Sequence, residues 1–422
     1  MKKIPEGWES TTLGHQIENM LGGGTPDRSN PDYWDGEIPW ATVKDLTSPI
    51  LAGTSEHITC EGLQNSSSKL IPSGTIIMAT RMAVGKAVRF VCDVAINQDL
   101  KAVFPKKVLA IEFLHQWFRW NESNFASLGS GSTVAGIRQE VIKMFPILLP
   151  PLPEQEKIAD ILGGVDAAIN ATRRVIEQTR ILKRSLMQQL LTRGIPGRHK
   201  RFKPSPLGEI PEEWEVVKLR EIAVIQTGIA KNGKIKNGHS IKVPYLRVAN
   251  VQDGYVDLSE MKDIEISEDK LKRYLLKRRD VLFNEGGDAD KLGRGCVWEG
   301  QIDPCVHQNH VFVVRCGKQL NPYFLACQAG SQRGKQFFFH SSKQTTNLAS
   351  INSSQLKEFP VFLPDINEQK SIIRALDGTD IRINNEIKTI EILQSVEFAL
   401  MQALLSGDTR IPAKALKRKE AV

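Results

Sequence analysis

The stretch LLPPLPEQEKIADIL at residues 148–162 recurs in altered form as FLPDINEQKSIIRAL at residues 362–376. The two stretches agree at six positions, and Glu154 and Glu368 set the offset at 368 − 154 = 214, about half of the 422-residue chain. Solenoid repeats recur every ~20–50 residues, so this spacing does not indicate a solenoid. It predicts two copies of one whole domain, and two copies of whatever that domain does.

The correspondence extends over most of the chain, with offsets between 205 and 214. In each copy short apolar segments are separated by Pro, Gly and Asn, a pattern typical of short strands and turns. Each copy is therefore predicted to begin with a compact α+β domain. The paired segments are IPEGWES (4–10) with IPEEWEV (210–216), EIPWATVKDL (37–46) with KVPYLRVANV (242–251), SGTIIMA (73–79) with RRDVLFN (278–284), and STVAGIRQEVIKMFPILLP (132–150) with TTNLASINSSQLKEFPVFLP (345–364).

After each Glu-Gln pair the pattern changes to apolar residues spaced alternately four and three apart. Such heptads predict a long helix with one apolar stripe. A lone helix would expose its stripe, whereas two copies in one chain can bury each other's. The sequence therefore predicts an α+β fold in which two long helices pair as an antiparallel coiled coil with pseudo-two-fold symmetry. The predicted stripe contains Ile158, Leu162, Ile169 and Ile176 in the first copy and Ile372, Leu376, Ile383 and Ile390 in the second.

The segment RGIPGRHKRFKPSPLG at 193–208 is rich in proline, glycine and basic residues, which is typical of a linker. The basic C-terminal end is predicted to be a frayed tail. The predicted organisation is a first domain at 1–153, a helix at 154–193, a linker at 194–208, a second domain at 209–367, a second helix at 368–406 and a tail at 407–422.

Composition favours a cytoplasmic protein with a mild preference for polyanions. The formal charge is +8, from 56 basic and 48 acidic residues. No apolar run reaches the ~18 residues that cross a bilayer, and MKKIPEGWEST at the start lacks the apolar core of a signal peptide. The six cysteines form no CxxC pair, so reduced thiols are expected.

Catalytic and metal-binding motifs are represented only by partial matches, so we predict no catalytic residue and no metal. NPDY at 30–33 lacks the second proline of the amino-methyltransferase tetrad, PDINEQK at 364–370 is too compact for a nuclease motif, and no Gly-Lys pair precedes Ser or Thr as in a P-loop. One cluster has the residue types of a zinc site, but CVHQNHVFVV alternates as a strand does, so no zinc is predicted there. That cluster is Cys296, Cys305, His307, His310 and Cys316.

A binding function for nucleic acid fits the basic, glycine-containing loops that follow one strand of each copy, at 81–86 and 285–295. Arginine and lysine can contact phosphates or guanine edges, and glutamine and asparagine can contact adenine. The alternative is that these residues are solvated charges and capping amides of the fold. The predicted DNA contacts are Lys44, Arg81, Lys86, Arg89, Gln98, Thr133, Arg247, Asn250, Lys291, Arg294, Gln308, Asn309, Lys343 and Thr346.

The chain resembles the specificity subunits of type I restriction–modification systems along nearly its whole length. The resemblance is carried by IPEGWE and IPEEWE, IPWATVKDL, VGKA and DKLGRG after an apolar strand, NQD and HQNH, GSTVAGI, and LPEQEKIADIL with its long helix. The second copy departs from the family pattern, since PDINEQK stands where PLPEQEK is typical. Asp365 and Asn367 therefore put partner docking at that end in doubt.

The resemblance implies a non-catalytic subunit that recognises a bipartite, asymmetric double-stranded DNA site through two target-recognition domains. It implies docking of two methyltransferase subunits, which methylate adenine with S-adenosylmethionine, and of two motor-nuclease subunits, which use ATP and Mg. No cofactor is expected in this chain. The helix starts, with Glu154, Gln155, Glu368 and Gln369, are the expected docking surface, together with the stripe. A methyltransferase–nuclease fusion and a scaffold that does not read sequence are the alternatives.

Overall fold

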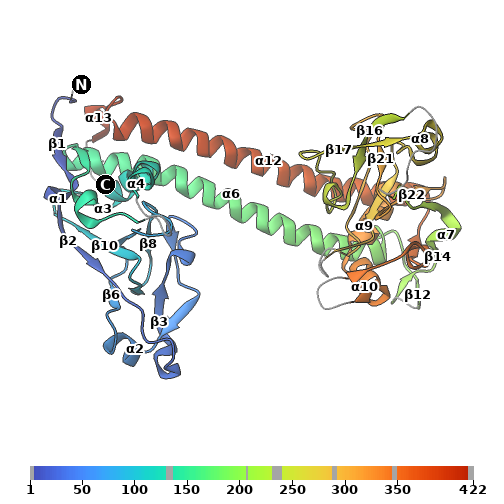
Figure 1. The fold of residues 1–422 in the computed structure, drawn as a ribbon, viewed down its shortest axis with the longest axis horizontal. Helices are drawn as coiled ribbons and strands as arrows, with labels where there is room; N and C mark the ends of the chain where they lie inside the picture. The colour runs from blue at the N-terminus through green and yellow to red at the C-terminus, as the bar shows by residue number, and fades with distance from the viewer. Residues whose placement is uncertain are drawn as a thin grey trace. The chain divides into compact units, whose positions relative to one another are not determined.

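The computed structural model describes residues 4–129, 136–205, 208–230, 240–287, 292–344 and 349–416. The chain divides into two compact units, unit 1 with residues 1–173 and 388–422, and unit 2 with residues 174–387. The two long helices, α6 (Leu152–Arg193) and α12 (Ile366–Leu405), each pass from one unit into the other. Each unit thus combines one α+β domain with part of each long helix (Figure 1).

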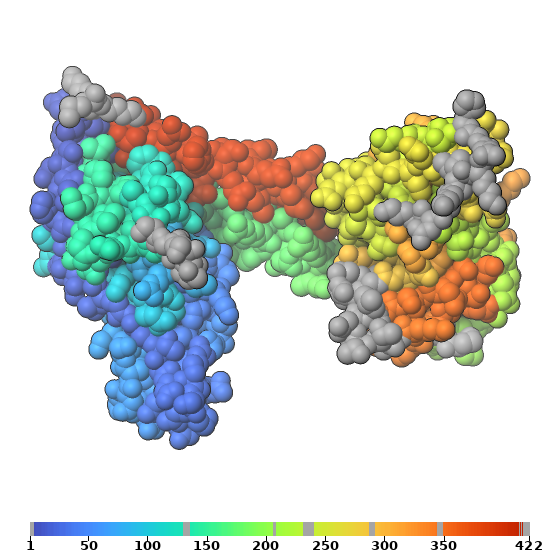
Figure 2. Space-filling view, viewed as in Figure 1, coloured from blue at the N-terminus to red at the C-terminus, as the bar shows by residue number. Residues whose placement is uncertain are grey.

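The domain of unit 1 contains two sheets. One has the order β2-β10-β7-β8-β4, and the other β5-β3-β9-β6. The second sheet and α2 form the lobe that projects away from the long helices (blue in Figures 1 and 2). The strands of the two sheets are β2 (Ile17–Gly22), β10 (Leu100–Pro105), β7 (Ile76–Ala79), β8 (Ala87–Phe90), β4 (Ile50–Leu51), β5 (Glu56–Ile58), β3 (Trp34–Ala41), β9 (Val94–Ile96) and β6 (Lys69–Ile71).

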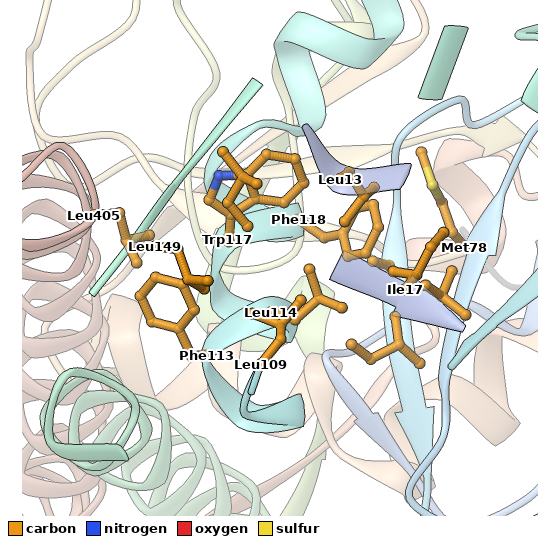
Figure 3. Close-up of a cluster of buried hydrophobic side chains, with 14 of the residues drawn as sticks. Leu13, Ile17, Met78, Leu109, Phe113, Leu114, Trp117, Phe118, Leu149 and Leu405 are labelled. Carbon is orange, nitrogen blue, oxygen red and sulfur yellow. The ribbon is translucent and has the colours of Figure 1, made fainter. Parts of the chain in front are cut away.

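The helices of this domain are short, and one of them, α3, lies between the first sheet and the long helices. Its residues Phe113, Leu114, Trp117 and Phe118 are almost fully buried (Figure 3). Burial of each such side chain contributes about 1.5–3 kcal/mol. The remaining elements are α1 (Leu13–Gln16), α2 (Cys60–Gln64), α3 (Ile111–Trp120), α4 (Glu122–Leu128), α5 (Gln139–Lys143), and β1 (Glu9–Thr12) paired with β11 (Pro146–Leu149).

The domain of unit 2 repeats this topology. Its sheet β15-β22-β18-β20 has the order of β2-β10-β7-β8, and the parallel pair of β16 with β21 corresponds to that of β3 with β9. The repeat in sequence is therefore also a repeat in topology. The strands are β15 (Ala223–Gln226), β22 (Val311–Cys316), β18 (Val281–Asn284), β20 (Gly295–Val297), β17 (Lys262–Ile266), β16 (Ile241–Leu246), β21 (Val306–His307), and β14 (Glu215–Lys218) paired with β25 (Pro360–Leu363).

Smaller elements complete unit 2 and the C-terminal segment. The predicted linker contributes a strand, since β12 (Phe202–Lys203) pairs with β13 (Ile210–Pro211). The others are α7 (Leu219–Ile222), α8 (Glu268–Tyr274), α9 (Pro322–Gly330), α10 (Gln332–Ser341), α11 (Ser353–Lys357), α13 (Ala413–Leu416) and the small strands β19 (Gly286–Gly287), β24 (Ala349–Ser350) and β23 (Lys343–Gln344).

The predicted fold class, α+β domains joined by paired long helices, is confirmed. In unit 1 the start of α6 packs in one core with the end of α12, and in unit 2 the end of α6 packs with the start of α12. The helices are therefore antiparallel within each unit. Most of the predicted stripe is buried, with Ile383 and Ile390 half-buried, whereas Leu182, which breaks the heptad phase, is 53% exposed. In the described residues no helix is both long and apolar enough to cross a membrane.

Candidate nucleic-acid interface and helix clamps

Glu154, in the first turn of α6, ties three distant segments of unit 1 together. Its Oε1 accepts hydrogen bonds from Arg410 Nε at 2.8 Å and from the Ile411 amide at 3.2 Å. Its Oε2 accepts from Trp8 Nε1 at 3.1 Å and from Arg410 Nη2 at 2.9 Å. The side chain is only 1% exposed, and burial raises its pKa, but these hydrogen bonds outweigh burial and leave the pKa below its ordinary value. We call Glu154 and these donors clamp 1.

Unit 2 contains the equivalent cluster, clamp 2, around Glu368 in the first turn of α12. Trp214 Nε1 donates to Oε2 at 3.1 Å, and the Ile195 amide donates to Oε1 at 3.3 Å. His199 Nε2 lies 2.7 Å from Oε1, and Arg198 Nε lies 3.4 Å from Oε2. A histidine and an arginine thus stand where clamp 1 has the bidentate Arg410.

The glutamine after each clamp glutamate holds the start of a domain helix. Gln155 Oε1 accepts from the Ala110 amide at 2.8 Å, and its Nε2 donates to the carbonyls of Val108 and Pro150. Gln369 makes the same three bonds, to the Asn321 amide at 2.8 Å and to the carbonyls of Gln319 and Pro364. The Glu-Gln pair recurs because each copy needs this joint between its helix and its domain.

The clamps bear on two predictions from the sequence. The clamp glutamates and glutamines are at most 1% exposed, so they contact this chain itself, and their predicted role in partner docking stays a prediction. Ile195 and Ile411, which were assigned to the linker and the tail, are structural parts of the clamps. The signal that sequence reasoning missed is the Ile-Pro pair that follows each long helix, at 195–196 and 411–412.

Among the predicted DNA contacts in unit 1, Lys44, Arg81 and Gln98 are exposed and Lys86 is half-buried. Arg81 is in a tight loop between β7 and β8, where Met82 has φ 62° and Gly85 has φ 91°. A β-bridge joins Arg81 to Gly136, so the basic loop and the segment before α5 form one edge. Gln98 accepts a hydrogen bond from Thr25 Oγ1 at 2.6 Å through its side-chain oxygen.

Three predicted contacts bond to the fold itself, and their role in DNA contact stays a prediction. Arg89 is 20% exposed, donates to the Gly74 carbonyl at 2.7 Å and pairs with Glu112 at 3.2 Å. Asn250 is 2% exposed, because its side chain accepts from the Arg247 amide and donates to two backbone carbonyls. Arg247 donates to the Glu260 carbonyl at 2.8 Å. The Asn250 side chain thus caps its loop, since such side-chain to backbone bonds hold loops in place.

The remaining predicted contacts that the structure describes are in unit 2. Lys343 is exposed in β23, and Gln308 and Asn309 are half-buried after β21. Arg294 is half-buried and donates to Gln252 Oε1 at 3.0 Å. Thr133, Lys291 and Thr346 lie outside the described residues.

The cysteine and histidine cluster weighed as a zinc site is part of the fold. His307 is buried, with Nδ1 2.7 Å from the Val311 carbonyl oxygen, and burial lowers its pKa to about 4. Cys296 and Cys305 are buried, which raises the pKa of each thiol to about 12. Over the described ranges, no three His, Cys, Asp or Glu residues are placed to hold a metal ion.

Comparison with known proteins identifies one family. A family model described as the type I restriction modification DNA specificity domain matches residues 5–178 and 211–397. The MjaIX specificity subunit of a type I restriction enzyme from Methanocaldococcus jannaschii is 24% identical over 97% of this chain and 95% of its own length. The EcoKI specificity subunit of Escherichia coli is 22% identical over 93% and 87%.

Two solved structures share the fold. A structure that concerns assembly and conformational transition of a type I restriction–modification system is 18% identical, with TM-score 0.60, and covers 97% of this chain and 100% of its own. The S subunit of such a system from M. genitalium is 13% identical, with TM-score 0.53, over 96% and 97%.

Proposed function

The chain belongs to the type I restriction modification DNA specificity family, and on that premise we propose that it is the DNA-recognition subunit of a type I restriction–modification complex. The observation that carries the proposal is the match of the family model to both halves of the chain, 5–178 and 211–397. The duplicated domain topology supports it, because two recognition domains in one chain suit a DNA site in two parts. The chain itself is non-catalytic.

The two domains read different half-sites, so the complete site is asymmetric. The basic loop of unit 1 at 81–86 and its counterpart at 285–295 share little beyond glycine, lysine and arginine. In unit 1 the exposed Arg81 and Gln98 supply a guanidinium and an amide, the two groups best suited to guanine and adenine edges. In unit 2 Arg294, Gln308 and Asn309 supply the same chemistry.

The partners are double-stranded DNA, two methyltransferase subunits and, in the full complex, two motor-nuclease subunits. The methyltransferase subunits bind S-adenosylmethionine and modify adenine, and the motor-nuclease subunits bind ATP and Mg. The complex acts in the cytoplasm. Two copies of the same helix-to-domain joint, at Gln155 and Gln369, support a scaffold that offers equivalent positions to two identical partners.

The decisive experiment is methylome sequencing of a host that expresses this chain with its neighbouring modification subunit. We expect one split, asymmetric methyladenine motif that disappears when this chain is deleted. Methylation of the same motif without the chain would assign recognition to another subunit. A complex that forms but methylates no defined motif would leave only a scaffold role.

A second measurement separates recognition from general attraction to polyanions. The purified complex is titrated with a duplex that carries the motif and with a scrambled duplex at several salt concentrations. If only phosphates are contacted, the affinities for the two duplexes fall equally as the salt concentration rises. If bases are contacted too, the affinity for the motif duplex stays higher than that for the scrambled duplex. Equal affinities at every salt concentration would refute sequence recognition.

A further inference from the structure

Arg119, at the end of α3 in the first recognition domain, bridges both long helices. Its Nη1 donates to Asp166 Oδ2 of α6 at 2.7 Å, and its Nη2 donates to Glu397 Oε1 of α12 at 2.6 Å. Gln116, one turn earlier in α3, also donates to Asp166 at 2.8 Å. The three charged side chains are only 15%, 18% and 13% exposed. Charges shielded in this way interact more strongly than those of a surface ion pair, and losing one member leaves a poorly solvated charge.

In unit 2 the equivalent contact between the two long helices is balanced in charge without a residue from the second domain. The offset of 214 residues places Asp380 opposite Asp166 and Lys183 opposite Glu397, since 166 + 214 = 380 and 183 + 214 = 397. Lys183 Nζ and Asp380 Oδ1 pair directly at 2.5 Å, with side chains 29% and 47% exposed. In unit 1 the two long helices therefore present two acids, which Arg119 of the domain bridges. In unit 2 Lys183 of α6 pairs directly with Asp380 of α12, and the charges of both also act on Asp377.

The second domain also lacks the bridging residue. The helix starts at Ala110 and Asn321 are equivalent, because their amides bond to Gln155 and Gln369, and 321 − 110 = 211. The counterpart of Arg119 is therefore Gly330, since 119 + 211 = 330.

Space does not dictate the glycine at this position. A Cβ at Gly330 would meet its nearest neighbour, Asp253 Oδ1, at 3.8 Å, an ordinary contact. A pocket of about 1210 Å³ opens here between α6 and the domain, lined by Gly330, Arg333, Arg184 and Met187. The tie that Arg119 makes in unit 1 thus has no counterpart at the equivalent place.

The presence of two acids beside one arginine also affects the pKa of Glu397. Burial raises the pKa of Glu397, Arg119 opposes that rise, and the nearby Asp166 adds to it. Glu397 is therefore an acid whose negative charge is costly to keep, although the equivalent residue of unit 2, Lys183, is a base. The arrangement is explained if Arg119 has a task besides neutralising charge.

We propose that Arg119 is a positioning residue that fixes the first recognition domain in one orientation on the paired helices, and thereby sets the register in which that domain meets its half-site. Among the described residues of the second domain, none makes a bridge of this kind to both long helices. This inference rests on the proposed function. It predicts that helix pairing and domain orientation can be separated by substitution.

The test uses the full chain in its complex with the modification subunit. In Arg119→Ala two acids face each other without a cation. In Arg119→Ala with Glu397→Lys the helices regain the acid–base pair of unit 2, but the domain stays untied. The matched controls are Lys183→Glu, and Lys183→Glu with Gly330→Arg, which transplant the network of unit 1 into unit 2. Each protein is measured for melting temperature and for affinity to duplexes whose spacer is one base pair shorter, correct, or one base pair longer.

Arg119→Ala should lower the melting temperature and the Arg119→Ala/Glu397→Lys variant should recover it, because the helix contact is restored. The double variant should nevertheless prefer the correct spacer about tenfold less than the original chain. In unit 2, Gly330→Arg should rescue Lys183→Glu and keep the spacer preference.

Two results would overturn the inference. If the Arg119→Ala/Glu397→Lys variant matched the original chain in both measurements, Arg119 would only balance charge. If it stayed as unstable as Arg119→Ala, the two networks would not be equivalent. The original chain serves as the internal control, because a failure to discriminate any spacer or motif would count against the proposed function instead.

Discussion

Replacing Glu154 by glutamine removes one negative charge at the centre of clamp 1 with almost no change in shape. Two carboxylate oxygens accept four hydrogen bonds there, two of them from Arg410. Glutamine keeps one oxygen and places an NH₂ group against two donors. Removing one side of a buried charged pair costs about 3–5 kcal/mol. Arg410 is 38% exposed and can partly rehydrate, so we expect ~2–4 kcal/mol.

The loss of stability caused by Glu154→Gln should be confined to unit 1. Unit 1 has 173 + 35 = 208 residues, and for domains of this size 1 kcal/mol corresponds to ~2–4 °C in melting temperature. Glu154→Gln should therefore lower the melting of unit 1 by roughly 5–15 °C at pH 7, measured by scanning calorimetry. Hydrogen exchange should place the change at the Ile411 amide, which loses its acceptor. Glu368→Gln is the matched control, and it should shift unit 2.

The effect should depend on pH with a definite sign. The pKa of Glu154 is lowered in the folded state by its hydrogen bonds, which outweigh burial. Its stabilisation is therefore present above the unfolded pKa, about 4.3, and is lost as pH falls through the lower, folded pKa. The difference between Glu154→Gln and the original chain should shrink in acid. A shift below 2 °C at pH 7, or one that persists unchanged below both pKa values, would refute this account of the clamp.

Three further outcomes are expected. Arg81→Ala should weaken recognition of one half-site without lowering the melting temperature. Arg89→Ala should instead destabilise unit 1, because the Arg89 guanidinium bonds to the fold. Calorimetry and half-site binding distinguish the two outcomes. Four residues inserted into the middle of both long helices add ~6 Å, so the preferred spacer should lengthen by about one or two base pairs at ~3.4 Å each; an unchanged methylome motif would show that the helices do not set it. Iodoacetamide should label the exposed Cys60 in the native chain but should label Cys296 and Cys305 only after unfolding, which mass spectrometry of the adducts would report. Rapid labelling of Cys296 or Cys305 in the native chain would contradict their burial.

The long helices were predictable because their signal is local. The heptad spacing that begins at Ile158 and at Ile372 indicates which face of each helix is apolar, whatever the tertiary structure around it. The domain repeat was predictable for a similar reason, since two copies of one fold keep matching strands and turns at a nearly constant offset. Trp8 and Trp214 occupy equivalent positions in the paired segments 4–10 and 210–216, and in the structure both donate to a clamp glutamate.

Single DNA-contact residues were harder to predict, because residue type does not reveal whether a polar group is already bonded. Asn250 suits an adenine edge as well as a loop cap, and the structure places it in the cap. Arg89 has the chemistry of a phosphate contact, but its guanidinium reaches Gly74 across the sheet. Asparagine is frequent in turns and caps, so its residue type alone does not distinguish a cap from a base contact.

The two domains, the two long helices and the duplicated Glu-Gln pair were all predictable from the amino-acid sequence, since each depends on residues near one another in the chain or on a repeat. The partners of the two glutamates were not predictable in this way, because they come from distant segments that meet only in the folded protein. Glu154 binds Arg410 across 256 residues, and Glu368 binds the Ile195 amide across 173. The physical reason is that a buried carboxylate needs donors, and which donors reach it depends on where the helices end in space.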